Sequence, residues 1–166
     1  MVKTKHIIVV VGILTGGILA ALIFWQSEEA KIRKQFEFIA EKIEKKPGES
    51  PIIAAAKAYQ IREVVAERCR IDAPAYSAPR NIPSDEFPAI VLRVRSEYSA
   101  ISLTFHDFDI EFPEQDIAQV KVTAIMEGKS ANGEPVEDFH ELKCSLQKTD
   151  EVWRLKEIGV VEVLKK

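Results

Sequence analysis

The sequence contains few cysteines, histidines and glycines, and it has no short motif that identifies a reaction. Its two cysteines, Cys69 and Cys144, and its three histidines lack the short spacings that structural metal sites use. Two cysteines so far apart do not define a disulfide, and we interpret them as separately buried thiols, with a disulfide as the alternative. We therefore predict no metal and no cofactor.

Clustered positive charge is also absent. The chain has 23 lysines and arginines against 26 acidic residues, with a net charge of −3. Lysines and glutamates are interspersed, as on solvated helix faces, whereas phosphate binding needs a concentrated positive field. This pattern argues against nucleic acid as a partner.

One long apolar run is present at residues 7–25, which read IIVVVGILTGGILAALIFW. At about 1.5 Å per residue a helix of this length spans roughly 28 Å, close to the hydrocarbon thickness of a bilayer. Lys3 and Lys5 precede the run and Trp25 closes it, in the order typical of a membrane helix. The run is longer than the core of a signal peptide, and bulky residues occupy the place of a cleavage site. We predict an uncleaved transmembrane anchor whose partner is the lipid bilayer.

The anchor divides the chain into a short basic flank (1–6), the span (7–25) and a single soluble domain (26–166). A long domain after one N-terminal span is usually exported, so we expect a single-pass protein of the bacterial inner membrane with a periplasmic domain. Basic residues soon after the span outnumber Lys3 and Lys5. A cytoplasmic domain is therefore the alternative.

Helical spacing of apolar residues predicts three helices after the anchor, over residues 28–46, 51–68 and 84–98. The proline-rich segment 70–83 is expected to interrupt regular structure. On the third helix, Arg93, Arg95 and Glu97 are predicted to face solvent.

The pattern then alternates with the period of strands, over residues 101–112, 117–127, 136–147 and 153–164. A change of phase predicts a β-bulge at His106 or Asp107, Asn132-Gly133 predicts a hairpin turn, and Gly159 predicts a second bend or bulge. These elements indicate an α+β fold, with three helices packed into the concave side of a strongly curved, mainly antiparallel sheet.

The order of elements, the bulged strand and the runs DIAQVKVTAIMEG and EDFHELKCSLQKTDEVWRLKEIGVVEV resemble the nuclear transport factor 2-like superfamily. This cone-shaped α+β fold includes SnoaL-like and steroid isomerase-like proteins. The resemblance covers residues 28–164 and implies a cone whose members include isomerases, dehydratases, and binding or assembly domains. It carries over no individual catalytic residue.

Two groups of polar side chains are candidates for chemistry. Asp138 and His140 share the apolar face of their strand, about 7 Å apart, and could form an acid and base pair inside the cone. His106, Asp107 and Asp109 at the expected bulge are a second pocket group. Trp153 is a further pocket candidate, although its register with its strand favours a place in the core.

No third group that would orient Asp138 and His140 can be identified, so we predict no catalytic residue and no enzyme. The expected function is a membrane-tethered, non-enzymatic binding or assembly domain that engages a protein partner or further copies of itself. The alternative is a small-molecule-binding or isomerase/dehydratase-like pocket in the cone that uses Asp138 and His140.

Overall fold

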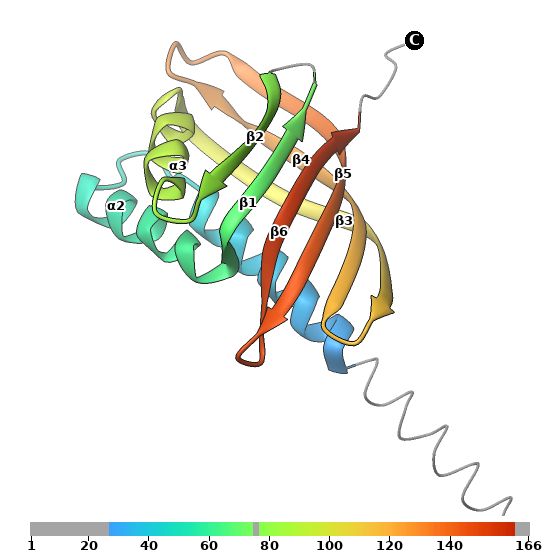
Figure 1. Cartoon of the computed structure of the whole chain (residues 1–166). Coiled ribbons are helices and arrows are strands. Elements are labelled where there is room, and N and C mark those ends of the chain that lie inside the picture. The colour runs from blue at the N-terminus through green and yellow to red at the C-terminus, as the bar shows by residue number, and fades with distance from the viewer. Residues whose placement is uncertain (1–26, 75–76, 162–166) are drawn as a thin grey trace, which may run out of the picture. The chain divides into compact units, whose positions relative to one another are not determined.

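The computed structural model describes residues 27–74 and 77–161 (Figure 1). The chain divides into two compact units, residues 1–34 and 35–166. In the first unit, residues 27–34 are helical. The predicted anchor at 7–25 lies outside the described residues. Within the described part of the chain, no helix combines the length and the apolar character needed to cross a membrane.

The second unit is a six-stranded sheet with helices on one side (Figure 1). The first helix continues through residues 35–43. The remaining elements are α2 (Pro51–Gln60), η1 (Ile61–Val64), β1 (Val65–Ala73), β2 (Ser77–Pro83), α3 (Phe87–Ser96), β3 (Tyr98–Glu114), β4 (Ile117–Ser130), β5 (Pro135–Thr149) and β6 (Val152–Val161). The strand order is β2-β1-β6-β5-β4-β3, and only β1 and β6 pair in parallel. The predicted α+β fold with three helices and a curved, mainly antiparallel sheet is confirmed.

The second helix is shorter than predicted. Ser50 caps α2 by accepting a hydrogen bond from the Ile53 amide at 3.4 Å, as its sequence indicates. The helix ends at Gln60 rather than near Arg68, and a strand begins at Val65. Val65, which starts the strand, is β-branched and favours extended structure over helix, and the buried residues Val65, Cys69 and Ala73 lie on one face of β1.

The segment 70–83 is not irregular, because it contains part of β1 and all of β2. β2 is an edge strand, where a proline does not remove a ladder hydrogen bond that the sheet needs. The sheet therefore has two more strands than the alternation pattern predicted.

The predicted bulge in β3 is confirmed. The register with β4 shifts between His106 and Asp109, and Asp107 has a φ of 54°. The turn at Asn132-Gly133 is also confirmed, with φ of 86° at Gly133. Gly159 is not a bulge, since it lies in continuous register with Lys143 of β5. The register between β5 and β6 shifts instead between Ser145 and Leu146.

The core lies between the sheet and the helices. The Phe36 ring of the first helix meets the rings of Phe105 and Phe108 edge-on, with centroids 5.1 and 5.3 Å apart. Cys69 and Cys144 are buried free thiols on β1 and β5. Because β6 lies between these strands, the two Cα atoms are about 10 Å apart, beyond the reach of a disulfide.

Candidate functional site

Asp138 and His140 lie together on the helix-facing side of β5. They share this face with the buried residues Cys144 and Leu146, because residues two apart in a strand point the same way. The imidazole Nε2 of His140 donates a hydrogen bond of 2.8 Å to Asp138 Oδ2, so the side chains meet although their Cα atoms are two residues apart. The Phe139 amide donates to the other carboxylate oxygen at 3.1 Å.

This pair, which we call the dyad, is accessible from solvent without being fully exposed. Its side chains have relative exposures of 36% for Asp138 and 30% for His140. A carboxylate that accepts a hydrogen bond from one imidazole nitrogen fixes the orientation and tautomer of the ring. Such a pair can take up and return a proton during a reaction.

The neighbours of the dyad on this face are apolar. On β4, Met126 lies directly opposite Asp138, and Ala124 lies opposite His140. Beyond them on β3 lie Leu103 and Phe105. A molecule held against this part of the sheet would meet hydrocarbon surface around one polar pair.

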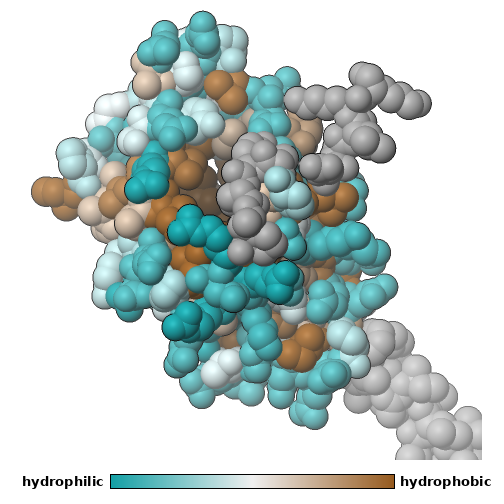
Figure 2. Space-filling model, turned by 45° about the horizontal axis from the view of Figure 1, so that its top comes forward, coloured by the Kyte–Doolittle hydropathy of each residue, from teal (hydrophilic) through white to brown (hydrophobic). Residues whose placement is uncertain are grey.

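A cavity of about 200 Å³ opens between the helices and the sheet in the same unit. Its lining is entirely apolar and comes from the first helix, η1, α3, β1 and β6: Ile39, Ile43, Ile61, Val65, Phe87, Ile90, Val91, Val94, Leu155 and Ile158. Figure 2 shows hydrophobic residues gathered around a hollow in the surface. Apolar cavities of this size can hold small hydrocarbon groups.

The bulge group points away from the helices. His106 pairs with Thr123 and Asp109 pairs with Lys121, both of which alternate with the buried residues of β4. His106 Nε2 lies 3.2 Å from Thr104 Oγ1, and Asp109 lies 3.4 Å from the Lys121 ammonium. His106, Asp107 and Asp109 are therefore exposed on the outer face and are not brought together with the dyad.

Trp153 is part of the core. It is 3% exposed on β6, and its ring is 5.8 Å from that of Phe112. Its predicted register is correct, and it does not line the apolar cavity.

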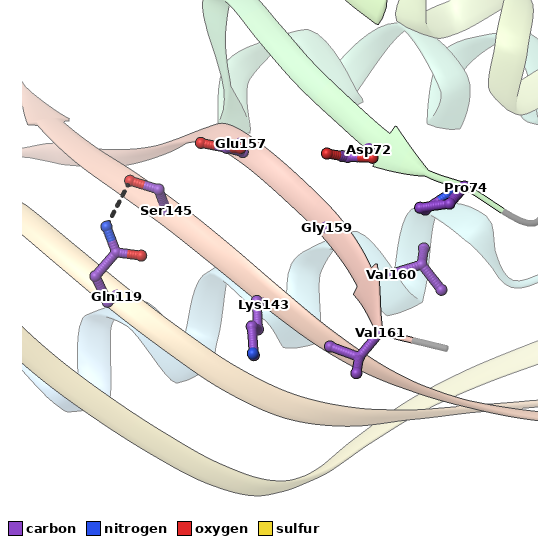
Figure 3. Close-up of a pocket in the computed structure, with 9 residues that line it drawn as sticks. All are labelled: Asp72, Pro74, Gln119, Lys143, Ser145, Glu157, Gly159, Val160 and Val161. Atoms are coloured by element: carbon purple, nitrogen blue, oxygen red, sulfur yellow. Dashed lines mark hydrogen bonds between the residues drawn. The ribbon is translucent and has the colours of Figure 1, made fainter. Parts of the chain in front are cut away.

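A second hollow lies on the outer face of the sheet, with a volume of about 360 Å³ (Figure 3). We call it the outer groove. It crosses β4, β5, β6 and the end of β1, and its polar lining is formed by Asp72, Gln119, Lys143, Ser145 and Glu157, with Gly159 between them. Gln119 donates a hydrogen bond of 3.2 Å to the Ser145 hydroxyl. No pattern in the sequence indicates this hollow, because it depends on which strands are neighbours in the sheet.

The prediction that Arg95 faces solvent is wrong. The residue is 2% exposed and pairs with Glu49, while its Nη1 donates to the carbonyls of Lys42 and Glu44 at 2.5 and 2.7 Å. Lys57 holds the other side of the Glu49 carboxylate at 2.8 Å. One signal was present in the sequence, since Arg95 continues the i, i+4 series from Phe87 through Val91.

This Arg95 cluster consists of Arg95, Glu49, Lys57 and the last carbonyls of the first helix. It satisfies acceptors that a helix C-terminus leaves without partners and ties three helices together. Burial alone would raise the pKa of Glu49, but the Lys57 hydrogen bond and the charges of Arg95 and Lys57 outweigh it, so the pKa lies below its ordinary value. Among residues 27–74 and 77–161, no group of three or more acidic, histidine or cysteine side chains could hold a metal ion.

No protein-family model matches the sequence, and no curated protein matches it. Solved structures do match the fold. An NTF2-like protein with a cystatin-like fold from Novosphingobium aromaticivorans has a TM-score of 0.65 and 12% identity, over 89% of this chain and 90% of that one.

Two further similar structures carry enzyme names. A candidate scytalone dehydratase from Novosphingobium aromaticivorans has a TM-score of 0.64 and 13% identity, over 84% and 86% of the two chains. The hexachlorocyclohexane dehydrochlorinase LinA-type3 from Novosphingobium barchaimii has a TM-score of 0.63 and 9% identity, over 82% and 86%.

These neighbours overturn the prediction of a non-enzymatic binding or assembly domain, because proteins of the same fold include a dehydrochlorinase and a candidate dehydratase. The argument against an enzyme assumed that nothing orients Asp138 and His140. The two side chains orient each other, and the Phe139 amide holds the carboxylate. The chain shares its fold with the NTF2-like protein from Novosphingobium aromaticivorans.

Proposed function

We propose that this protein is an enzyme that binds a small, largely apolar molecule on the concave side of its sheet. The reaction is an isomerisation or an elimination that proceeds by proton transfer, with Asp138 and His140 as the acid and base pair. The observation that carries the proposal is the 2.8 Å hydrogen bond between these two half-exposed side chains on the helix-facing side of β5.

The roles of the two residues follow from their hydrogen bond. Asp138 orients the imidazole, and His140 removes a proton from the substrate and later returns it or transfers it to a leaving group. Both reaction types begin with the removal of a proton from a carbon acid, which one oriented base can perform. The dehydratase and dehydrochlorinase names of the fold neighbours support an elimination, although their identities of 13% and 9% establish only the fold.

The surroundings of the dyad support an apolar substrate. Leu103, Phe105, Ala124 and Met126 adjoin the pair on the sheet. The apolar cavity offers about 200 Å³ on the same side of the sheet for a hydrocarbon group. Apolar surroundings exclude water and strengthen the electrostatic interactions of the one polar pair.

Replacing Asp138 with Asn and His140 with Gln tests this function, since both substitutions keep polarity and remove acid and base chemistry. We expect the double variant to accumulate normally and to fail to rescue a deletion phenotype. Thr123→Val on the outer face of β4 is the control and should rescue. Full rescue by the double variant would contradict an enzymatic role for the dyad.

We also propose that residues 7–25 anchor the protein in the bacterial inner membrane with its domain in the periplasm. The support is the uncharged run of nineteen residues with Lys3 and Lys5 before it and Trp25 at its end. A C-terminal reporter that is active only outside the cytoplasm should be active. A stable but inactive fusion would instead indicate a cytoplasmic domain.

A further inference from the structure

The solvent-facing side of α2 is apolar, which is unusual for a surface helix. α2 packs against α3 and η1 (Figure 1), and its buried residue is Ala58. Its only charged residue is Lys57, whose ammonium bonds to the Glu49 carboxylate at 2.8 Å and to the Glu44 carbonyl at 3.1 Å. A surface helix normally turns its apolar stripe to the core and charged or polar side chains to water. α2 instead turns apolar side chains to water.

Four residues form a continuous stripe on this side, which we call the α2 stripe: Ile52, Ala55, Ala56 and Tyr59. Their spacing of i, i+3, i+4 and i+7 places them within about 100° around the helix axis. All four are exposed, Ile52 by 82% and Tyr59 by 63%. Alanine favours an exposed helix by its propensity alone, but the two large residues gain nothing from facing water. The α2 stripe therefore has the composition of a helix contact that one copy of the chain leaves uncovered.

The α2 stripe is complementary to itself in size. Its order along the helix is large, small, small, large. If two copies of α2 pack antiparallel about a two-fold axis at the alanines, Ile52 of each copy meets Tyr59 of the other. The small alanine side chains then allow the helix axes to approach to about 8 Å. A two-fold interface uses the same patch on both partners, and the α2 stripe meets that requirement without a second surface.

A membrane surface fits the α2 stripe less well than a second helix does. Helices that lie in the membrane interface insert large apolar side chains and carry several lysines or arginines on their polar face. The middle of the α2 stripe is alanine, and the single lysine of α2 is held by Glu49. These features favour close approach of a helix over insertion into lipid.

The sequence of the proposed anchor also supports a second copy. Gly12 and Gly16 lie four residues apart in the run 7–25, a spacing at which two membrane helices pack closely. The contact between two ten-residue helices falls below the roughly 1,200 Å² that stable interfaces bury, so α2 by itself would form a weak dimer. Anchors in one membrane would raise the local concentration of the copies and offset this weakness.

We propose that α2 is the interface of a homodimer, in which the α2 stripes of two copies pack antiparallel around a two-fold axis. The dyad lies on β5, and the lining of the apolar cavity comes from the first helix, η1, α3, β1 and β6. The dimer therefore does not depend on the proposed reaction.

The test is cysteine cross-linking of the full-length protein in its native membrane. Ala55→Cys and Ala56→Cys are made separately and treated with a short bismaleimide, which joins two thiols that lie close together. The native Cys69 and Cys144 are buried and should not react. At least one variant should give a cross-linked dimer on a denaturing gel. Gln119→Cys, exposed on the outer face of the sheet, should remain monomeric.

Ile52→Glu, added to the variant that cross-links, tests the contact itself. The substitution should leave the melting temperature unchanged because Ile52 is exposed in a single copy. In the dimer it would bury two carboxylates without partners, so the cross-linked fraction should fall at least about fivefold. Phe139→Glu is the matched control, because Phe139 is an exposed apolar residue on the outer face of the sheet. It should leave the cross-linked fraction unchanged.

Two results would overturn the proposal. The first is the absence of a dimer in both alanine-to-cysteine variants. If their thiols are then also shielded from a water-soluble maleimide, lipid or a different protein covers the α2 stripe. The second is an undiminished cross-link in the presence of Ile52→Glu. The Asp138 and His140 double variant should give the same cross-link as the wild-type background, so loss of the reaction and loss of the dimer are distinguishable.

Discussion

Replacing Arg95 with Met tests the buried cluster that joins the helices around the cavity. Methionine keeps a long, flexible apolar side chain and removes the guanidinium. The Glu49 carboxylate, whose side chain is 6% exposed, would then keep only Lys57. The carbonyls of Lys42 and Ile43 would lose their side-chain donor, at 2.5 and 3.1 Å in the native protein.

The expected loss of stability follows from what happens when one partner of a buried ion pair is removed. Removing one partner of such a pair costs about 3–5 kcal/mol, because the remaining charge stays buried. Lys57 remains 2.8 Å from Glu49 and compensates in part, so we expect the lower end, about 3 kcal/mol. For a domain of this size that corresponds to a fall in melting temperature of roughly 6–12 °C.

Urea denaturation of the purified protein, followed by circular dichroism at neutral pH, measures this loss. Arg93→Met is the matched control, because Arg93 is exposed on the same helix two residues away. Its free energy of unfolding should change by less than about 0.5 kcal/mol. Equal effects of the two substitutions, or a loss below about 1 kcal/mol for Arg95→Met, would refute this account of the cluster.

The same structure predicts three further outcomes. Because the pKa of Glu49 is lowered in the folded protein, the ionised carboxylate stabilises the fold above the ordinary pKa of 4.5, and this stabilisation is lost as the pH falls through the lower folded-state pKa. Glu49→Gln should therefore flatten the acid limb of a plot of stability against pH. An unchanged acid limb would count against the pairing of Glu49 with Arg95 and Lys57. Burial raises the pKa of both Cys69 and Cys144 to about 12. Both thiols should therefore resist alkylation by iodoacetamide at pH 8 until the protein is unfolded in urea. Rapid alkylation of either thiol in the folded protein would contradict its burial. Gly128→Ala should destabilise the domain by more than about 1 kcal/mol, because the new Cβ would lie 2.2 Å from the Ala100 carbonyl oxygen. Gly159→Ala is the control and should not destabilise it. Equal urea midpoints for the two variants would contradict the close approach of β3 and β4.

Much of the fold was predictable because local patterns and tertiary packing agree. The alternation in β4 and β5 correctly identified the buried face, and the phase change at His106 correctly identified the bulge. β1 was missed because its first residues continue the apolar spacing of α2. Only pairing with β2 and β6, which is not local, determines that the strand begins at Val65.

The candidate site was predicted in part for the same reason. Residues two apart in a strand share a face, so Asp138 and His140 could be paired from the sequence. Their direct hydrogen bond also depends on the side-chain rotamers, which the sequence pattern does not determine. The bulge group was assigned a pocket role inside the cone; Asp109 instead lines a small hollow of about 80 Å³ on the outer face, together with Glu111 and Lys121. Arg95 was assigned to solvent because charge usually indicates exposure, and only its partners on other elements explain its burial.

The most direct test of the proposed function is metabolite profiling with the purified protein. Wild-type protein and the Asp138→Asn, His140→Gln double variant are incubated separately with a small-molecule extract of the source cells and compared by mass spectrometry. The account predicts that the wild-type protein alone depletes a metabolite and forms a product of the same mass, or of that mass less a small eliminated molecule such as water. Equal conversion by the double variant, or no conversion by the wild-type protein, would contradict it.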